Sequence, residues 1–393
     1  MSSDTLFSWS PLETAESWYV SDVCICGVKQ VIGSLSDGVS ATVVSVDINS
    51  GKKTAEWKQI PTAVVSLGAF ATSPVLFAFD KEGSIWQLDI RSNGTHPTSS
   101  SALSCRRPGD VAHAGAISSD GHSLAVAMTM ANETTKKKNK KSNAVGDQAS
   151  SSDDESVEPL TYSVQLWDVR NIVSPLHSYS RSHSDDVQYV HICIGELGRN
   201  FQAVSFSFDQ PSLLISGGAD GLVNIFDSRI PNEDDALQST CQMDSSINRV
   251  GFLSSNRAYA VTDDNCYSIL KLNSPDDVDV LFRKKYACDG RFLVDILDCD
   301  RDECFYLLES TGEGKATVCA ISNDGSKVHT VKELEEHKDL IRCARYDVNQ
   351  RLIVTGADDC RICGSELLPP VVDVFVAKGK PKDKLRRRKP YVR

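Results

Sequence analysis

The chain has 393 residues, with 53 Asp and Glu against 42 Lys and Arg, and a formal net charge of −11 at pH 7. It contains no apolar run of about 18 residues that could span a membrane, and its first residues lack the basic and apolar regions of a secretory signal. We therefore expect an intracellular protein without a membrane anchor, whose 13 cysteines stay reduced.

Short alternating apolar segments recur along the chain and end on similar positions. In chain order, the segments end at Val46, Trp86, Trp167, Phe226, Leu270, Cys319 and Ser365. Subtracting successive positions gives spacings of 40, 81, 59, 44, 49 and 46 residues. Four of the six lie near the period of about 40–45 residues that is typical of a four-stranded propeller blade. The two long spacings contain insertions, so the pattern predicts an all-β, seven-bladed β-propeller.

A second marker runs in phase with the first. An Asp stands six residues before the end of four segments, at Asp80, Asp220, Asp264 and Asp359. Asp220 belongs to a Gly-rich stretch of the kind that forms tight turns, and we expect the same of the others. His183 and His337 each open a repeat. We expect them to bind the strand residues Ser216 and Thr355.

These markers resemble the structural tetrad of the WD40 repeat family. Its residues are His183, Ser216, Asp220, Phe226, His337, Thr355, Asp359, Asp80, Trp86, Trp167 and Asp264. The resemblance implies that hydrogen bonds within each tetrad join the strands of a blade. The repeats are degenerate, because Phe226 has no indole N–H and several of the other end positions carry no aromatic ring.

The middle of the chain carries a closer resemblance. Residues 182–187, 216–227 and 232–237, together with the arginine-rich end, are similar to the family of WD repeat-containing protein 89. This resemblance implies a WD40 scaffold rather than a particular activity. The lysine-rich loop within 131–160 and the segment 188–202 depart from the pattern of that family.

The sequence predicts three regions. Residues 1–14 form an N-terminal segment, 15–376 the WD40 propeller, and 377–393 a basic disordered tail. Within the propeller, the polar stretch 131–160 is predicted to be a disordered loop. Residues 188–202 interrupt a first strand and are either an extra loop or a retained intron. The last blade is closed either by a strand at 371–376 or by the N-terminal segment.

The C-terminal tail is the strongest charge feature. Residues 378–393 contain nine Lys and Arg, including Arg386, Arg387, Arg388 and Lys389, and one Asp. The tail is thus +8, and the rest of the chain is −19. A basic tail on an acidic body is typical of nuclear import or of contact with RNA and other polyanions. We favour a nuclear protein, with polyanion contact as the alternative.

No catalytic, cofactor-binding or metal-binding motif is found. The stretch from Gly312 to Lys315 lacks the second glycine and the Ser or Thr of a phosphate-binding loop. Cys360 and Cys363 have the spacing of a zinc or redox pair, but we expect buried apolar side chains there. Catalytic residues, cofactors and metal ligands are therefore predicted to be none.

The leading hypothesis is a non-enzymatic scaffold that binds other proteins. The alternative is a substrate receptor of a cullin-4 ubiquitin ligase. Trp167-Asp168-Val169-Arg170 and Phe226-Asp227-Ser228-Arg229 resemble the W-D-x-R box of such receptors. That resemblance implies that Arg170 and Arg229 contact the ligase adaptor. A basic residue after this strand is also common in WD40 proteins that bind no ligase.

Overall fold

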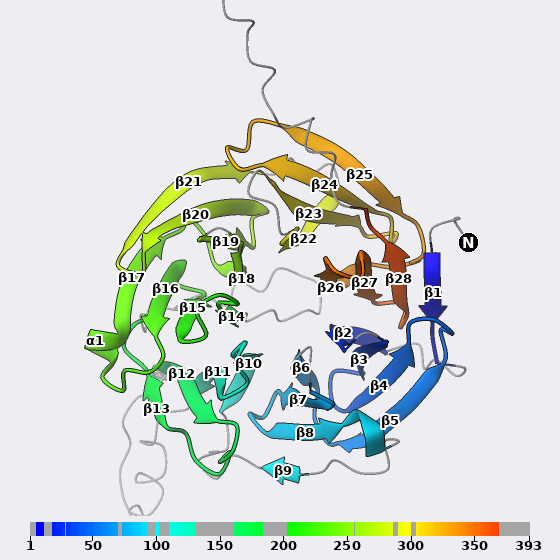
Figure 1. Cartoon of the computed structure of the whole chain (residues 1–393), viewed down its shortest axis with the longest axis horizontal. Helices are drawn as coiled ribbons and strands as arrows, with labels where there is room; N and C mark the ends of the chain where they lie inside the picture. The colour runs from blue at the N-terminus through cyan, green and yellow to red at the C-terminus, as the bar shows by residue number, and fades with distance from the viewer. Residues whose placement is uncertain are drawn as a thin grey trace, which may run out of the picture.

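The computed structural model describes residues 5–11, 18–27, 29–69, 73–92, 99–101, 110–130, 161–183, 203–254, 256–285, 290–299 and 304–368. These residues form seven four-stranded antiparallel sheets arranged as a ring (Figure 1). The prediction of a seven-bladed β-propeller is confirmed.

Each sheet is one blade, and its strands are given below in order from the axis outward. The blades are blade 1, β2 (Tyr19–Cys26), β3 (Gln30–Ser36), β4 (Ala41–Asp47) and β5 (Lys53–Ile60); blade 2, β6 (Val64–Ala69), β7 (Val75–Asp80), β8 (Ile85–Asp89) and β9 (Ser99–Ser101); blade 3, β10 (Val111–Ile117), β11 (Ser123–Met130), β12 (Thr161–Asp168) and β13 (His177–Tyr179); blade 4, β14 (Ala203–Phe206), β15 (Leu213–Gly217), β16 (Leu222–Asp227) and β17 (Leu237–Gln242); blade 5, β18 (Ile247–Leu253), β19 (Arg257–Thr262), β20 (Cys266–Ser274) and β21 (Asp277–Lys285); blade 6, β22 (Arg291–Leu297), β23 (Cys304–Thr311), β24 (Ala316–Ser322) and β25 (Val328–Leu334); and blade 7, β26 (Ile341–Asp347), β27 (Leu352–Ala357), β28 (Ile362–Glu366) and β1 (Thr5–Trp9).

Every repeat end found in the sequence lies on the third strand of its blade. These strands are β4, β8, β12, β16, β20, β24 and β28. Both faces of an inner strand pack against side chains, since each sheet stands between two others. All five residues of β15, for example, are buried. The apolar runs are therefore nearly continuous, as expected for strands covered on both faces.

The core consists of clusters between neighbouring blades. One cluster joins Ile32 and Trp57 of blade 1 to Leu76 and Leu88 of blade 2, and all four side chains are at most 1% exposed. Similar clusters fill the gaps around the ring. The fold therefore has no single hydrophobic core, and the packing of each blade depends on its two neighbours.

Blade 7 is completed by the N-terminal strand β1. In Figure 1, β1 (dark blue) lies beside β28 (red), and Phe7 pairs with Gly364. Phe7 is 4% exposed and packs in the cluster between blades 7 and 1. A Cβ at position 364 would lie 2.1 Å from the Phe7 ring, so only glycine leaves room for this side chain. We call β1 and its contacts the latch.

The latch decides between the two predicted closures of blade 7. The fourth strand of this sheet is β1, so the closure by the N-terminal segment is confirmed, and residues 371–376 lie outside the described residues. It also places part of residues 1–14 inside the propeller rather than before it. The sequence missed this boundary because β1 lacks the markers of a repeat.

Polar contacts tie the innermost strands together around the axis. Asp22 on β2 accepts a hydrogen bond from the Leu67 amide of the next blade at 2.8 Å. Arg345 on β26 lies between two carboxylates, with Nη2 3.2 Å from Asp22 and Nη1 3.8 Å from Asp295. Asp295 also accepts a hydrogen bond from the Tyr259 hydroxyl at 2.9 Å. Arg345 therefore connects blade 7 to both of its neighbours.

Helices are a minor part of the described chain. They are α1 (Glu233–Ala236) and the 3-10 turn η1 (Ile90–Ser92). Neither has the length to cross a membrane. Residues 131–160, 188–202 and 377–393, for which the sequence predicted loops and a tail, lie outside the described residues. The blade that 188–202 interrupts still has its four strands.

Candidate functional site

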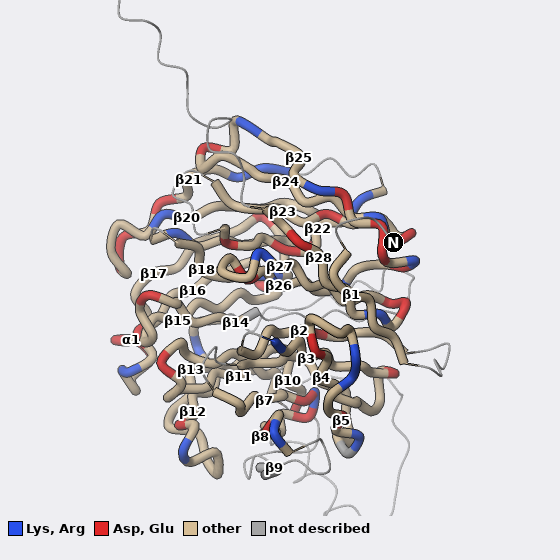
Figure 2. Tube along the Cα trace, turned by 45° about the vertical axis from the view of Figure 1, so that its right-hand side comes forward, with Lys and Arg blue, Asp and Glu red and all other residues tan. Residues whose placement is uncertain are grey.

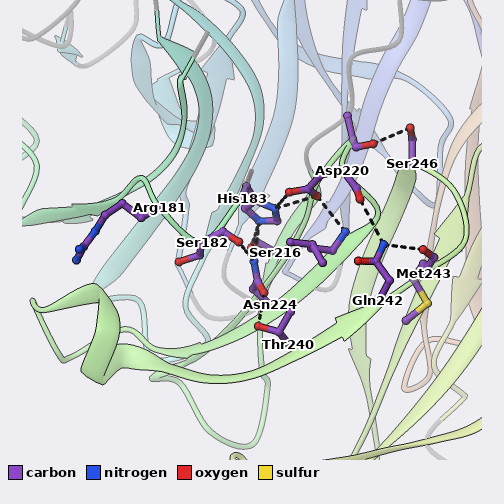
Figure 3. A network of polar contacts seen from close by, with 12 residues as sticks. Arg181, Ser182, His183, Ser216, Asp220, Asn224, Thr240, Gln242, Met243 and Ser246 are labelled. Atoms are coloured by element: carbon purple, nitrogen blue, oxygen red, sulfur yellow. Dashed lines mark hydrogen bonds and ion pairs between the residues drawn. The ribbon is translucent and has the colours of Figure 1, made fainter. Parts of the chain in front are cut away.

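His183 lies at the centre of a polar network in blade 4 (Figure 3). Its Nε2 is 2.8 Å from the Ser216 hydroxyl, and its Nδ1 is 3.2 Å from both carboxylate oxygens of Asp220. The side chain is 6% exposed. A proton on Nδ1 lets the ring donate to Asp220 and accept from Ser216. The structure thus brings together three residues that the sequence placed in one tetrad.

The backbone before His183 is positioned by a carboxylate that sequence reasoning missed. Glu233 on α1 accepts hydrogen bonds from the backbone N–H groups of Ser180, Arg181 and Ser182 at 2.7–2.8 Å. Burial alone raises the pKa of Glu233, but these bonds and the Ser182 hydroxyl lower it overall. Glu233 is therefore an ionised anchor for the segment that carries His183.

Asn224 provides a side-chain N–H donor, which Phe226 lacks. Its Nδ2 donates to the Ser182 carbonyl at 2.7 Å, and its Oδ1 accepts from the Thr240 hydroxyl at 2.7 Å. Phe226 instead stacks on Tyr179, with ring centroids 4.8 Å apart. Asn224 stands two residues before Phe226, so the period of the strand puts both on one face. The spacing of two residues from Phe226 could have identified Asn224 in the sequence.

His337 forms the equivalent network in blade 7. Its Nε2 is 2.8 Å from the Thr355 hydroxyl, and its Nδ1 is 3.1 Å from Asp359. Burial alone lowers the pKa of His337, but its hydrogen bonds to Asp359 and Cys363 raise the pKa to about 9. The ring is therefore positively charged at neutral pH.

Ser365 stands where blades 2, 3 and 4 have Trp86, Trp167 and Phe226, and it has a different role. Its hydroxyl donates to Glu336 at 2.7 Å, and the same Glu336 oxygen accepts from Thr5 of the latch at 2.8 Å. Glu336 therefore joins the end of one repeat to the N-terminal strand. The hydroxyl of Ser365 thus takes part in the closure of the propeller.

Asp80 opens its turn, because its carbonyl accepts a hydrogen bond from the Gly83 amide at 2.9 Å, and does not lie inside the turn as Asp220 does. It is the last residue of β7 and pairs with Ser84, whose amide donates to its side chain at 2.7 Å. The turns 81–83 and 219–221 have the same length, but Trp86 pairs with Ala78 as Asn224 pairs with Ser216. Trp86 therefore lies two residues earlier in its strand than Phe226, and the same offset of six residues reaches the position of Gly218. The Trp86 indole donates directly to Asp80 at 2.9 Å.

Two other predicted tetrad residues do not join such a network. The buried Trp167 indole has no hydrogen-bond partner among the described residues, because Val126 takes the strand position that Ser216 has in blade 4. Asp264 lies in a turn, as predicted, where it accepts from the Thr262 hydroxyl at 2.6 Å. Asp264 forms an ion pair with Lys285, whose Nζ is 3.6 Å from Oδ2, where Asp220 of blade 4 contacts a histidine.

We predict that His183→Ala and His337→Ala each lower the free energy of unfolding by about 1–3 kcal/mol, because each leaves buried polar groups unpaired. The exposed His329→Ala is the matched control.

The stabilisation by His337 should depend on pH. Because the folded pKa of His337 is raised from 6.5 to about 9, its contribution to the free energy of unfolding is complete below pH 6.5 and is lost as pH rises toward 9. Urea denaturation of the unmodified chain and of His337→Ala across this pH range tests the trend. A difference in free energy of unfolding between the two that grows with pH would contradict it.

Arg170 and Arg229 are exposed and held in the same way. In each, Nε and Nη2 donate to the carboxylate two residues earlier, Asp168 or Asp227, at 2.6–2.9 Å. Their side chains are 78% and 74% exposed. The hydrogen bonds from Arg170 lower the pKa of Asp168 to about 2. Each guanidinium is thus fixed by one edge while its other edge faces solvent.

A third arginine of this kind was missed in the sequence. Arg91 follows β8 and donates to Asp89 at 2.6–3.0 Å, with 70% of its side chain exposed. Asp89 stands three residues after Trp86, so the motif does not include the aromatic residue. Figure 2 shows basic positions next to the ends of β8 and β12. Blades 2, 3 and 4 therefore present one clamped arginine each, and we call these residues the arginine row.

Large apolar side chains are exposed near the arginine row. They are Val173 and Leu176, which follow Arg170, and Phe208 between β14 and β15, which is 84% exposed. The loops are tied together, because Tyr179 donates to the Ile230 carbonyl at 2.7 Å and Ser228 donates to Ser212. Apolar area beside fixed arginines is a common composition of protein-binding surfaces.

The cysteines show no metal site within the described part of the chain. Cys360 lies in the turn before β28 rather than in the strand, and burial raises its pKa to about 11. Cys363 lies on β28, 3.3 Å from the Ser8 hydroxyl of the latch. Cys299 and Cys304 are buried with their sulfurs 3.6 Å apart.

Parts of the chain are similar in sequence to WD repeats of other proteins. A model of the WD domain, G-beta repeat matches residues 325–363, which include the first two strands of blade 7 and the residues His337, Thr355 and Asp359. An uncharacterised WD repeat-containing protein of Schizosaccharomyces pombe is 22% identical over 50% of this chain and 60% of its own length. An uncharacterised WD repeat-containing protein of Saccharomyces cerevisiae is 30% identical over 31% of this chain and 27% of its own.

Each match spans less than two thirds of the relative. Among solved structures, the β-propeller domain of Myceliophteria thermophila Cps50 (Swd1) superposes with a TM-score of 0.60 at 12% identity, covering 91% of this chain and 99% of that one. At that identity the similarity concerns the fold alone.

Proposed function

We propose that this chain, a member of the WD40 repeat family, is a non-enzymatic scaffold that binds other proteins, in the nucleus. Propellers present loops on a rigid frame, and WD40 propellers generally bind proteins in this way. Within the family, its kinship with WD repeat-containing protein 89 is part of the proposal, and so are the propeller limits of 15–376 together with β1.

The arginine row is the observation that carries this proposal. Each guanidinium is already held by its own aspartate, so binding a partner requires little further ordering of the side chain. The row lies on three consecutive blades, with exposed apolar side chains between two of them. An acidic protein surface with an apolar centre fits this arrangement.

Affinity purification with mass spectrometry tests the scaffold role. We expect a set of partners that is recovered with the full chain and lost when Arg91, Arg170 and Arg229 are all replaced by Ala. Lys58→Ala is the control, because that side chain is 70% exposed on a different part of the ring. Equal recovery from both variants would exclude the arginine row as the binding surface.

The basic tail supports the nuclear part of the proposal. We expect a chain ending at Ala377 to shift toward the cytoplasm, since it loses nine basic residues and a net charge of +8. Fluorescence microscopy of the two versions measures this. Unchanged localisation would remove the import hypothesis and favour polyanion contact through the tail. RNA binding by the tail peptide would then be the next measurement.

The second candidate function is a substrate receptor of a cullin-4 ubiquitin ligase. Arg170 and Arg229 each stand three residues after the closing aromatic residue and are exposed, as contact with an adaptor requires. Arg→Lys at either position should weaken adaptor binding nearly as much as Arg→Ala, because lysine lacks the planar donor fork. A lost charge-assisted contact of about 1.5–3 kcal/mol corresponds to at least a tenfold loss of affinity.

Arg91 provides the internal comparison for this candidate. It has the same clamp but lacks the adjacent aromatic residue. A ligase receptor should lose adaptor binding with Arg170→Lys and Arg229→Lys and retain it with Arg91→Lys. Failure of the unmodified chain to co-purify with the adaptor would exclude the receptor role and leave the general scaffold.

A further inference from the structure

Blade 6 contains a polar cavity of about 140 Å³ at the end of its β23–β24 hairpin. Strands β22 to β25 and the turn 311–315 line it. Since one water occupies about 30 Å³, the cavity has room for about four waters or for the end of one long side chain. Its charged lining residues are Arg291, Glu309, Lys315, Glu333 and Glu335.

Glu309 is the unusual member of this lining. It pairs with Thr317 on β24, the strand position that corresponds to Ser216 in the network of blade 4. A carboxylate therefore stands where a tetrad has a hydroxyl. Glu309 is 1% exposed, and its Oε1 accepts a hydrogen bond from Arg291. Its buried Oε2 has no hydrogen-bond partner among the described residues.

A buried carboxylate oxygen without a partner is costly, so the site favours an additional donor. Burial raises the pKa of Glu309, and the Thr317 hydroxyl offsets this only in part. The cavity has three carboxylates against two cations, with Glu333 and Glu335 exposed at its mouth. Figure 2 shows charged positions of both signs around β22 to β25. One more cationic donor would balance the charge.

The geometry points to a cation that the chain itself supplies: we propose that a lysine of the segment 378–393 binds in this cavity. Lysine suits the site because its slender stem ends in a compact ammonium with three donors. The bound ammonium would donate to Glu309 Oε2 and face Glu333 and Glu335. The inference goes beyond the scaffold role, since it assigns a resting place to the tail.

The path of the chain supports this source. Leu368, the last described residue, is held on blade 6, where the Tyr306 hydroxyl donates to its carbonyl at 2.9 Å. The ten residues from there to Lys378 reach about 33 Å when extended. Strand β24, with seven residues, spans only about 23 Å from one end of the blade to the other. Tethering also keeps the lysines at an effective concentration in the millimolar range.

Fluorescence anisotropy with a labelled peptide of residues 378–393 tests the proposal. The protein is the chain ending at Ala377, which retains all seven described blades. We expect binding that falls at least tenfold with Glu309→Gln and stays unchanged with Asp235→Asn, an exposed carboxylate on α1 that matches the change in charge. We also expect at least tenfold weaker binding to the full chain, whose own tail occupies the cavity.

Three results would overturn the proposal. Equal loss with Glu309→Gln and Asp235→Asn would indicate attraction to the acidic surface in general. Equal binding to the full and shortened chains would show that the tail is not the occupant, and that the cavity takes a cation from another molecule. Undiminished binding of a peptide acetylated on its lysines would exclude lysine. If Glu309→Gln does not fold, the exposed pair Glu333→Gln and Glu335→Gln provides the same comparison.

Discussion

Deletion of residues 1–9 is expected to unfold or aggregate the protein at temperatures where the full chain is stable. The deletion removes β1, so the edge of β28 loses its partner and becomes a template for association. It also removes Phe7 from the cluster between blades 7 and 1. Replacing one buried Phe with Ala typically costs about 3–5 kcal/mol, and the loss of the whole strand should cost more.

Thermal melting and size-exclusion chromatography measure this effect. A chain lacking only residues 1–4 is the control, because it retains all of β1. Phe7→Ala should have an intermediate effect, and Gly364→Ala a similar one, since its Cβ would meet the Phe7 ring. A shortened chain that melts with the full chain and stays monomeric would mean that another segment closes the ring.

Arg345→Met is expected to lower the free energy of unfolding by about 3 kcal/mol. The substitution leaves Asp22 and Asp295 without their shared cation, and both carboxylate residues are at most 6% exposed. Breaking a buried pair in this way typically costs about 3–5 kcal/mol. We expect the lower end of that range because the Arg345 side chain is 43% exposed and water screens part of the charge.

The design of the variant separates charge from packing. Methionine retains much of the arginine stem, so the loss reflects mainly the missing guanidinium. Adding Asp295→Asn to Arg345→Met should recover part of the stability, because one unpaired carboxylate is removed. Arg361→Met is the control, since Arg361 contacts Asp359 at 3.7 Å away from the axis. Urea denaturation measures all four proteins, and the absence of recovery in the double variant would contradict the charge argument.

The repeats could be predicted from the sequence because their signals are local. Trp86, Trp167 and Phe226 end short, largely apolar runs, and a strand buried on both faces needs such a run whatever its partners are. The turn at Asp220 follows from Gly and Asp in the same way. His183 and His337 could be matched with Ser216 and Thr355 because each histidine opens a repeat and each hydroxyl residue precedes the turn Asp of that repeat.

The missed features depend on contacts between distant parts of the chain. Arg345 and Asp22 are 323 residues apart, and nothing near either residue indicates the other. The offset from Asp80 to Trp86 matches the other repeats, yet Trp86 occupies the strand position of Asn224 rather than that of Phe226, so Asp80 has a different place. The clamp of Arg91 was missed because its aspartate does not follow the aromatic residue. Glu309 carries no sequence marker, and only the pairing with Thr317 identifies its position.

The latch has a consequence for synthesis on the ribosome. The strand at Thr5–Trp9 is made first, but its partner at Ile362–Glu366 is made about 350 residues later. At about 5–20 residues per second, the wait is about 20–70 seconds. During this time the apolar side of β1 has no native partner, and blades 1 to 6 form an open arc with two unprotected faces. The nascent chain therefore passes through a long interval in which a chaperone can engage it, and release is expected only after blade 7 has left the exit tunnel.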